Sequence, residues 1–555
     1  MYGFEPYGTL AYGASSRIGA VLDPPEFIGF IESPVVDQSY IASFFVLPQI
    51  VEEITNDGPY GGAAYGANPY GGANTEVSAG LTEIGYSTMG YTSHLEDTPA
   101  NMHWEARLRQ PITFARGIET SEHLAGLTEL SGDIEVENGD GALDNFLEHY
   151  AVDGREVRVR AGPQSAPLEH FGDIFSGRIV RAEALLERFI IGVSDGLANL
   201  QGPLQSAFYA GTGGLEGGFN LKGKPKPLCF GYVFNVSPPL VDAVNLIYQV
   251  HAGRIRDVPM VYDRGVALTR VAGGPGMGQY SVDLINGTFR LGAPAAGTCT
   301  ADVEGDALPD FAAGTADIIL RLLMVYGRLT DSEIEPSSFS LSGYARSDVG
   351  YFIGVEPTAL AEVMAELLEG IGGYAGFNRF GRFEIGVLSE PRENPVMALT
   401  AENIIQFERL PLPAGLNPVV WRVTCGYKKN WTVQDDLAAS VPAARVQFAA
   451  QEYRIAEAAD SGIKSRHLLA QEMNIASLFR LETDAQGETL RRFELFSRPR
   501  YLYRIVSTPA AIRCAIGQCV NVIMPRYGLD RGALGSLVGS RFDAARGECE
   551  LTVFI

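Results

Sequence analysis

The stretch from residue 356 to residue 388 restricts the fold most, because a helix start, a helix stop and a hairpin follow one another there. Apolar residues recur at the spacing of one helical face, namely Leu360, Val363, Met364, Leu367, Leu368 and Ile371. Pro357 suits a first helical turn, and Gly372 and Gly373 predict a stop at positive φ. Residues 374–377 and 383–387 then predict two strands joined by a turn at 378–381. We expect this helix–hairpin to lie as a wedge between β domains.

The length and composition indicate a multi-domain folded protein. The chain has 555 residues, of which 46% are hydrophobic and 20% are charged. No apolar run is long enough for a membrane span. The first residues, MYGFEPYGTL, lack the basic region and apolar core of a signal peptide, so we expect synthesis in the cytoplasm.

The net charge restricts the kind of contact with nucleic acid. There are 66 acidic and 43 basic residues, which gives a formal charge of −23. This balance argues against a sequence-nonspecific DNA binder, which needs Lys and Arg to neutralise phosphates. It is compatible with a wall past which DNA slides, because repulsion would prevent sticking.

The pattern along the chain predicts a mainly β protein with minor α content, in which antiparallel β sandwiches or barrels flank a small α+β helix–hairpin domain. We divide it into a Gly/Tyr-rich arm or small β region (1–100), a β-sandwich or barrel (101–200), a β-rich connector with a Lys/Pro segment (201–300), an α+β domain with two helices and the hairpin (301–400), and a C-terminal β domain with one or two helices (401–555).

Two helical segments outside the hairpin unit are expected. In the first, Thr315 caps a helix that Gly327 ends. The second lies within 459–497, with Leu490, Phe493 and Phe496 as core positions.

Strands are expected in the sequences RPRYLYRIV, AIRCAIGQCVNVIMP and CELTVFI, and a glycine-rich turn region at 527–539.

The N-terminal arm repeats the dipeptide Tyr-Gly, and in PYGGAAYGANPYGG a tyrosine recurs every five residues. One interpretation is a long loop with glycine turns. The other is an extended arm that docks on another subunit, where tyrosine gives contact area at low entropic cost. The sequence leaves both open.

Several motifs suggest binding but have simpler explanations. Lys222, Lys224 and Lys226 form the densest basic cluster, which suits a solvated connector better than an acidic partner. The loop NGDGALDNF resembles a calcium loop but lacks its alternating carboxylates and final Glu, so an acidic turn is expected. Cys514 and Cys519 are the only close cysteines, without nearby His, so all six cysteines are expected to be free thiols.

No constellation of catalytic residues appears in the sequence. A nucleophile elbow, a phosphate-binding GxxxxGK[ST] loop and an HExxH motif are all missing. We therefore predict no catalytic, cofactor-binding or metal-binding residues, no cofactor and no enzymatic activity. A chance pair of carboxylates at glycosidase spacing cannot be judged from sequence.

Several segments together resemble one family. They are a strand ending in DVEG (302–305) followed by the helix from Thr315, the helix–GGY–hairpin, TCGYKKN (424–430) followed by WTV, and a closing part with IGQ (516–518), PRYGL (525–529) and Val538-Gly539. The segments SGDIEVENGDGALD and FSGRIV fit a first β domain. Over most of residues 101–555 the chain resembles the tail hub or tail-tip baseplate proteins of tailed bacteriophages and gene transfer agents.

This resemblance implies a structural hub protein at the distal end of a virion tail. Hubs of this type are usually trimers whose two β domains per chain form a pseudo-sixfold ring that closes the tail tube. The implied partners are further copies of the chain, a distal tail or tail tube protein, the tape-measure protein, and tail fibre or central tip proteins, with DNA only in transit through the lumen. Roles in host attachment and genome ejection follow from that position.

Two other functions stay open at this point. One is a receptor- or glycan-binding tail-tip adhesin that uses the aromatic N-terminal arm. The other is a cell-wall hydrolase that uses two carboxylates.

Overall fold

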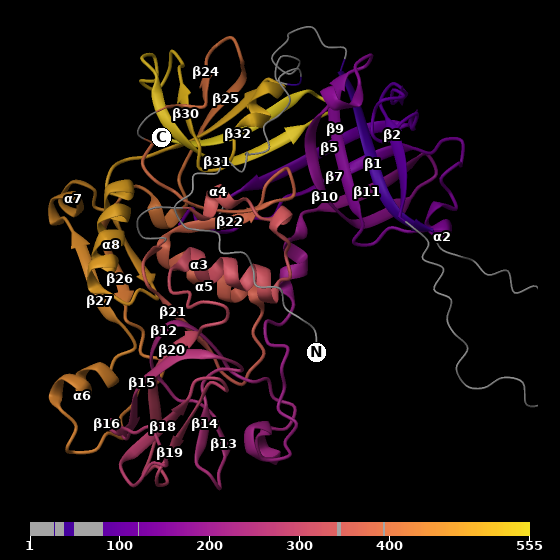
Figure 1. The fold of residues 1–555 in the computed structure, drawn as a ribbon. Coiled ribbons are helices and arrows are strands. Elements are labelled where there is room, and N and C mark those ends of the chain that lie inside the picture. Colours follow the sequence, from indigo (N-terminus) through magenta and orange to yellow (C-terminus); the bar gives the residue numbers. More distant parts are fainter. Residues whose placement is uncertain are drawn as a thin grey trace, which may run out of the picture.

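The structure, a computed structural model, describes residue 27 and residues 38–48, 81–119, 121, 123–340, 346–391 and 394–555. Strands dominate and helices are few, as the predicted mainly β fold requires (Figure 1). Most of the Tyr-Gly arm lies outside the described residues, so both hypotheses about it stay predictions. Within the described residues none of the sheets closes into a barrel.

The largest sheet contains two sets of six strands with the same topology. The first module consists of β1 (Gln38–Pro48), β5 (Leu108–Gly117), β7 (Ser131–Glu137), β9 (Glu156–Pro163), β10 (Gly172–Ala184) and β11 (Arg188–Ser194). The second module consists of β24 (Met397–Leu399), β25 (Ile404–Leu410), β29 (Leu502–Ser507), β30 (Cys519–Val522), β31 (Ala533–Asp543) and β32 (Glu548–Phe554). Their spatial orders are β5-β7-β11-β10-β9-β1 and β25-β29-β32-β31-β30-β24, so the strands correspond one to one in chain order.

The two modules also share their irregularities. The register shifts between Ile179 and Arg181 in β10, and between Leu537 and Gly539 at the corresponding place in β31. A second shift follows the first residue of β5 and of β25 alike. Since bulges are specific features of a strand pair, this agreement indicates a structural duplication. The modules differ in other respects. β1 runs antiparallel to β9 whereas β24 runs parallel to β30, and the register shifts between Asp173 and Phe175 and between Gln110 and Thr113 occur only in the first module.

Short elements extend the first module. The strands β2 (Thr82–Ser87), β4 (His103–Ala106) and β3 (Tyr91–Thr92) continue its sheet beyond β1, and β8 (Tyr150–Ala151) pairs with the end of β1. The helix α2 (Phe146–His149) lies between β7 and β9, as the short helix η9 (Pro509–Arg513) lies between β29 and β30.

Two five-stranded sheets, antiparallel except for the parallel pair of β17 and β18, form a sandwich at the far end of the molecule (Figure 1). One has the order β16-β15-β20-β12-β21, and the other the order β13-β14-β19-β18-β17. The bounds are β12 (Leu228–Val236), β13 (Leu240–Asp242), β14 (Ile247–Gln249), β15 (Ile255–Asp263), β16 (Val266–Ala267), β17 (Thr269–Arg270), β18 (Gln279–Asp283), β19 (Thr288–Leu291), β20 (Cys299–Asp306) and β21 (Gly350–Ile353). Apolar side chains from both sheets form one core between them.

The predicted helix–hairpin is present. Helix α5 (Leu360–Ile371) ends at Gly372, whose φ of 59° is left-handed, and strands β22 (Gly373–Phe377) and β23 (Phe383–Val387) follow. Two details of the prediction were wrong. The helix begins at Leu360, so Pro357 precedes it, and Gly373 is already part of a strand.

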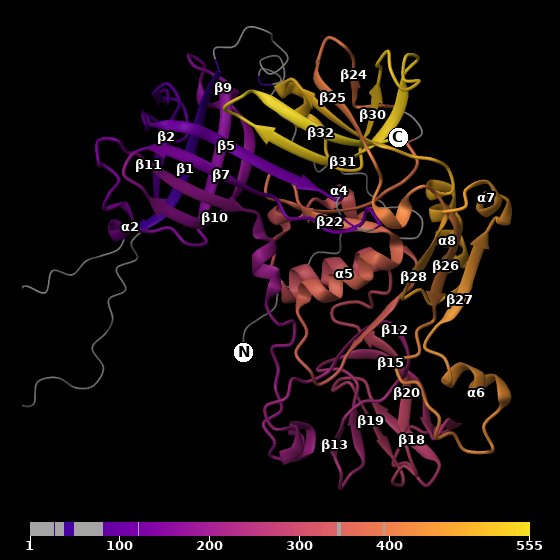
Figure 2. The ribbon, with the colours of Figure 1, turned by 180° about the vertical axis from the view of Figure 1, so that it is seen from behind.

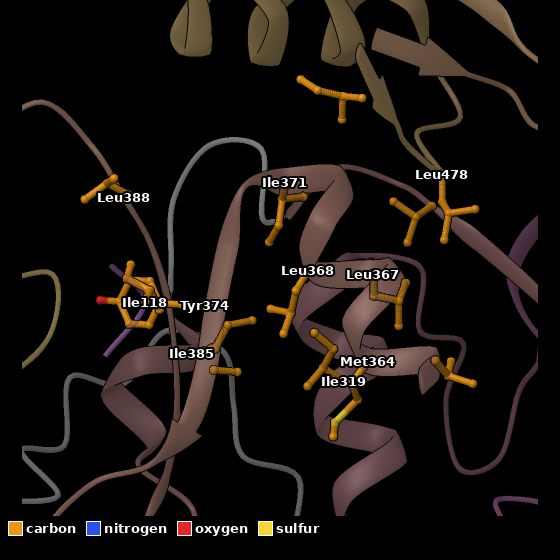
Figure 3. Packing of buried hydrophobic residues seen from close by; sticks show 14 of the residues in the cluster. Ile118, Ile319, Met364, Leu367, Leu368, Ile371, Tyr374, Ile385, Leu388 and Leu478 are labelled. Carbon is orange, nitrogen blue, oxygen red and sulfur yellow. The ribbon is translucent and has the colours of Figure 1, made fainter. Parts of the chain in front are cut away.

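The hairpin lies between the two modules, as a wedge should. β22 pairs with β6 (Gly126–Leu127), which belongs to the chain segment of the first module. The Tyr374 hydroxyl donates a hydrogen bond of 2.8 Å to the Ile516 carbonyl of the second module. Figure 3 shows Ile371, Leu368 and Met364 of α5 packed among the hairpin and neighbouring helices.

Helix α3 (Thr315–Arg321) also differs in detail from its prediction. Thr315 is its first helical residue and Gly314 occupies the cap position, so Thr315 is not the cap. The helix then widens into a π turn (Leu322–Tyr326) before Gly327, where the predicted end is confirmed. The short helix α4 (Pro336–Phe339) follows.

The C-terminal third contains a small α/β layer besides the second module. Strands β26 (Val420–Tyr427), β27 (Arg454–Ala459) and β28 (Gln471–Ala476) form a sheet against helix α8 (Glu482–Phe496), and helices α6 (Ala443–Ala449) and α7 (Ser461–Arg466) lie in the connections.

Two predictions for the last part of the chain differ from the structure. The expected turn region at 527–539 contains the start of β31, and only β30 is a strand within AIRCAIGQCVNVIMP.

Helix α8 turns charged side chains inward, which explains why Leu490 was wrongly predicted in the core. Glu488 is buried, and its carboxylate lies 2.6 Å from both Arg491 and Arg492. These two arginines donate hydrogen bonds to the Ile371 and Glu369 carbonyls at the end of α5. The triad therefore binds carbonyls in the last turn of α5, one of which, that of Glu369, also accepts from the Gly372 N–H, and Leu490 faces solvent.

A buried histidine lies in the sandwich. The Nδ1 atom of His251 accepts a 3.0 Å hydrogen bond from the Cys229 backbone, and its Nε2 atom lies 3.8 Å from Asp306. Burial lowers the pKa of His251 to about 4, although Asp306 acts in the opposite direction. The ring is therefore neutral at physiological pH.

Replacing Leu367 by Ala tests the core under the hairpin. The side chain is buried on α5, so its removal should lower the free energy of unfolding by about 2–5 kcal/mol. Leu490→Ala on α8 is the matched control and should cost far less, because Leu490 is exposed. Chemical denaturation of both variants measures the difference, and equal losses would contradict the packing.

His251 should make the sandwich sensitive to acid. Its pKa is lower in the folded state than the ordinary 6.5, so the unfolded chain takes up more protons as the pH falls from about 6.5 to about 4. Stability should therefore fall over this range, by up to roughly 3 kcal/mol. His251→Asn keeps an acceptor for the Cys229 N–H, and it should reduce the change of the unfolding free energy with pH, measured by urea titrations at several pH values. His149→Asn, at an exposed site, should leave this change as it is in the natural chain.

Candidate functional site

The two modules are joined by a direct strand pair. The second half of β5 runs antiparallel to the second half of β31, with Thr113 opposite Asp543 and Gly117 opposite Gly539. The first half of β31 pairs with β30 on the same side. Strand β31 is thus long enough to serve its own module and to receive a strand from the other (Figure 2).

Aromatic and turn contacts fill this joint. Phe114 of β5 lies between Phe175 and Phe542, with ring centroids 5.7 Å apart in each pair. The turn after β31 is fixed as well, because the Ala544 N–H donates a 3.0 Å hydrogen bond to the Ile112 carbonyl. The joint is therefore a packed core contact, which favours a fixed angle between the modules.

Glycines at the joint make room for a carboxylate. A Cβ atom on Gly117 or on Gly539 would overlap the side chain of Glu119. One oxygen of Glu119 is buried without a hydrogen-bond partner among the described residues. Burial, with a smaller effect from Glu550, raises the pKa of Glu119 above its ordinary value. This carboxylate opposes tight closure of the joint when it is charged.

The duplication shows that each module has one unused end. Arg178 in β10 and Ser536 in β31 occupy the same place, since each pairs with strands on both sides. After Ser536, the edge of β31 that faced β30 pairs with β5. After Arg178, the corresponding edge of β10, which faced β9, pairs with no described strand. At the other end β25, the counterpart of β5, pairs only with β29 among the described strands.

Apolar side chains are exposed at the unused end of β10, where their counterparts at the joint are buried. Val180 is 55% exposed, whereas the corresponding Val538 is 0% exposed. Leu186 is 87% exposed, whereas the corresponding Ala544 is 5% exposed. Exposed apolar residues next to a free strand edge are the features of an interaction site.

The unused end of β25 has an aromatic and arginine surface. The guanidinium of Arg409 lies 4.5 Å from the ring centre of Tyr501 and 4.7 Å from that of Tyr527. Tyr503 lies between these rings, and Ile405 is exposed on the same strand. Tyrosine and arginine contribute most often to the energy of protein interfaces.

One face of the shared sheet is polar across both modules. Arg181 pairs with Asp133 at 3.1 Å and with Glu183 at 3.5 Å, and Arg188 pairs with Glu135 at 3.4 Å. On the second module Arg504 pairs with Glu408. Arg181, Arg188 and Arg504 are thus paired with carboxylates, which reduces the positive charge available for phosphate.

The motifs noted in the sequence do not meet at a common site. Lys226 pairs with Glu216 at 2.8 Å and Lys224 with Glu356 at 3.7 Å, so two of the three lysines have acidic partners within the chain. In the loop NGDGALDNF, Arg107 binds Asp140 and holds the pKa of that carboxyl well below its usual range. Asn138 holds Asp144. The segment NGDGALDNF is thus a turn whose acidic side chains are bound by Arg107 and Asn138.

The remaining candidates give no binding centre. All six cysteines are free, as predicted. The described residues contain no group of three or more His, Cys, Asp and Glu side chains that could hold a metal ion. None of the helices in the described part of the chain is long and apolar enough to cross a membrane. Sequence reasoning missed the two unused strand ends, since no residue pattern marks a strand as lacking a neighbour.

Comparison with protein-family models and with curated proteins gives no match. Solved structures do match. The prophage MuSo2 43 kDa tail protein from Shewanella oneidensis is 11% identical, with a TM-score of 0.40 over 82% of this chain and 96% of that chain. The tail protein from Neisseria meningitidis MC58 is 11% identical, with a TM-score of 0.38 over 80% and 92%. A chain of the native gene transfer agent virion is 14% identical, with a TM-score of 0.40 over 60% and 84%.

The first two are described as tail proteins, and the third is part of a gene transfer agent particle.

Glu119→Gln should stabilise the joint at neutral pH. Because burial raises the pKa of Glu119, the folded state favours the protonated carboxyl, and its contribution is lost as the pH rises through that raised pKa. The variant should therefore melt at a higher temperature than the natural chain at pH 7, and the gain should shrink toward pH 4. Glu137→Gln, at an exposed position, is the control. A lower melting temperature of Glu119→Gln at pH 7 would contradict this reading.

Proposed function

We propose that this protein is a ring-forming structural hub of a bacteriophage-type tail. The observation that carries the proposal is the duplication: one module joins the other through a packed strand pair, and the same two surfaces at the outer ends pair with no strand that the structure describes. The outer β25 of one copy would pair with the outer β10 of the next copy, as β5 pairs with β31 within the chain.

This contact is heterologous, because it joins two different surfaces. Repeated contacts of this type form a closed ring when the rotation between units closes, and a filament when it does not. If the contact between chains copies the contact within them, all modules are related by one rotation. The resemblance to tail hubs indicates three chains, so that six modules match a sixfold tail tube.

The duplication also fixes the expected register between copies. Within the chain Ala115 lies opposite Arg541. Their counterparts are Leu410 at the end of β25 and Glu183 near the end of β10, as the matching registers of both modules require. Leu410 of one copy should therefore lie opposite Glu183 of the next.

Burial of the exposed apolar residues would favour this contact. Val180, Leu185 and Leu186 are exposed in a single chain. Fully burying one aliphatic side chain of this size contributes about 1.5–3 kcal/mol. The free N–H and C=O groups of the two strand edges would pair at the same time, which is strand addition between subunits.

The polar face of the shared sheet suits a lumen. Three of its arginines are paired with carboxylates, and the whole chain carries a charge of −23. DNA in transit would find few unpaired cations to bind. A protein of this design would sit in the virion at the distal tail, between the tube or distal tail protein, the tape-measure protein, and the fibre or tip proteins, with roles in attachment and ejection. We propose no enzymatic step.

Paired cysteines test the ring contact directly. The variant Glu183→Cys/Leu410→Cys should form disulfides between chains, giving covalent dimers and trimers on a non-reducing gel. The variant Ala115→Cys/Arg541→Cys is the matched control, because it places the same pair of positions at the joint within one chain and should give only an internal bridge.

Each single-cysteine variant measures the background from the natural thiols. Covalent oligomers that are as abundant in Glu183→Cys alone as in the double variant would contradict the register. An internal bridge in the control together with a strictly monomeric double variant would contradict the ring itself.

A further inference from the structure

Three loops form one surface at the end of the sandwich, away from the second module. They are residues 243–246, 271–278 and 292–298, and we call them the distal loops. Both ribbon views place the neighbouring strands β13, β18 and β19 at the end of the molecule opposite β24 and β25 (Figures 1 and 2). The distal loops are therefore remote from the strand ends assigned to the ring.

Backbone contacts hold the distal loops together. The Leu291 N–H donates a 3.0 Å hydrogen bond to the Leu246 carbonyl, which ties the first loop to the third. Gly292 lies so close to the backbone of Pro275 and Gly276 that a Cβ atom there would overlap it. The three loops thus present a continuous surface.

The distal loops themselves contain exposed apolar residues and no charged residue, while Asp263, Arg264 and Asp436 contact the third loop through its backbone. Val244 is 91% exposed and Met277 is 88% exposed, on neighbouring loops. None of the residues in the distal loops is charged, although a fifth of the whole chain is. Asp242, next to the first loop, accepts hydrogen bonds from the Val244 and Asn245 backbones, so its carboxylate is occupied within the turn.

We propose that the distal loops are the place where copies of this chain meet one another around the axis of the assembly. This inference rests on the proposed ring. Copies related by a rotation axis bring identical residues together near that axis, and identical charged residues would repel one another. Loops without charged residues, on which Val244 and Met277 are exposed, can approach their own copies without such repulsion. In a chain of charge −23, such a surface suits contact between like copies.

Contact between like residues is tested by one cysteine. In the assembled full-length protein, Met277→Cys should form a disulfide between residue 277 of one chain and residue 277 of another under mild oxidation. The matched control is Leu468→Cys, because Leu468 is 86% exposed but lies in a different part of the fold. The covalent dimer should be on the order of tenfold more abundant in Met277→Cys, since neighbours in an assembly have millimolar effective concentrations.

The mass of the assembly, from light scattering, separates the two proposals. A ring in which Met277→Cys forms no more dimer than Leu468→Cys overturns the contact of the distal loops and leaves the ring intact. A chain that stays monomeric overturns both. Flotation with neutral phosphatidylcholine vesicles that is abolished by Met277→Asp, without disulfide formation in Met277→Cys, overturns the self-contact and assigns the surface to lipid.

Discussion

The strand pair between β5 and β31 is the interaction on which the rest of the structure depends. It converts two modules, separated in the chain by residues 195–396, into one sheet with a packed aromatic contact at Phe114 and Phe542. Without this pair the two modules would have four unused edges. With it the chain has one donor end and one acceptor end, and a unit with two such ends can repeat around a ring.

The helix–hairpin contacts both modules next to this joint. Arg116 lies in β5 at the joint, and its guanidinium contacts Glu384 of β23 at 2.5 Å and Thr128 at 2.8 Å. Tyr374 of β22 reaches the second module through Ile516. The hairpin is thus bound to both modules by buried polar contacts, while the apolar face of α5 anchors it to the central core. A change in the angle between the modules would break these contacts, so they hold that angle fixed.

The local elements of this unit followed from sequence because their causes are local. The apolar period over Leu360 to Ile371 and the left-handed Gly372 depend on neighbours in the chain, and both appear as predicted. Leu490 failed as a core position because α8 buries Glu488 and Arg492 instead, in order to satisfy carbonyls of another helix. A pattern rule that counts apolar residues does not contain that partner, since it comes from a distant part of the chain.

The sequence by itself determined the mainly β class, the hairpin unit, the free cysteines and the acidic balance that disfavours DNA binding. Only the tertiary structure decided that the chain contains a duplication, that β5 adds to β31, and that the corresponding edges of β10 and β25 pair with no further strand among the described residues. The physical reason is that the sequence of a strand specifies its alternation and its bulge but not the strand that lies beside it. Corresponding residues such as Val180 and Val538, or Leu186 and Ala544, can therefore differ in burial. Whether a strand edge is filled depends on pairing across hundreds of residues, and no local pattern encodes it.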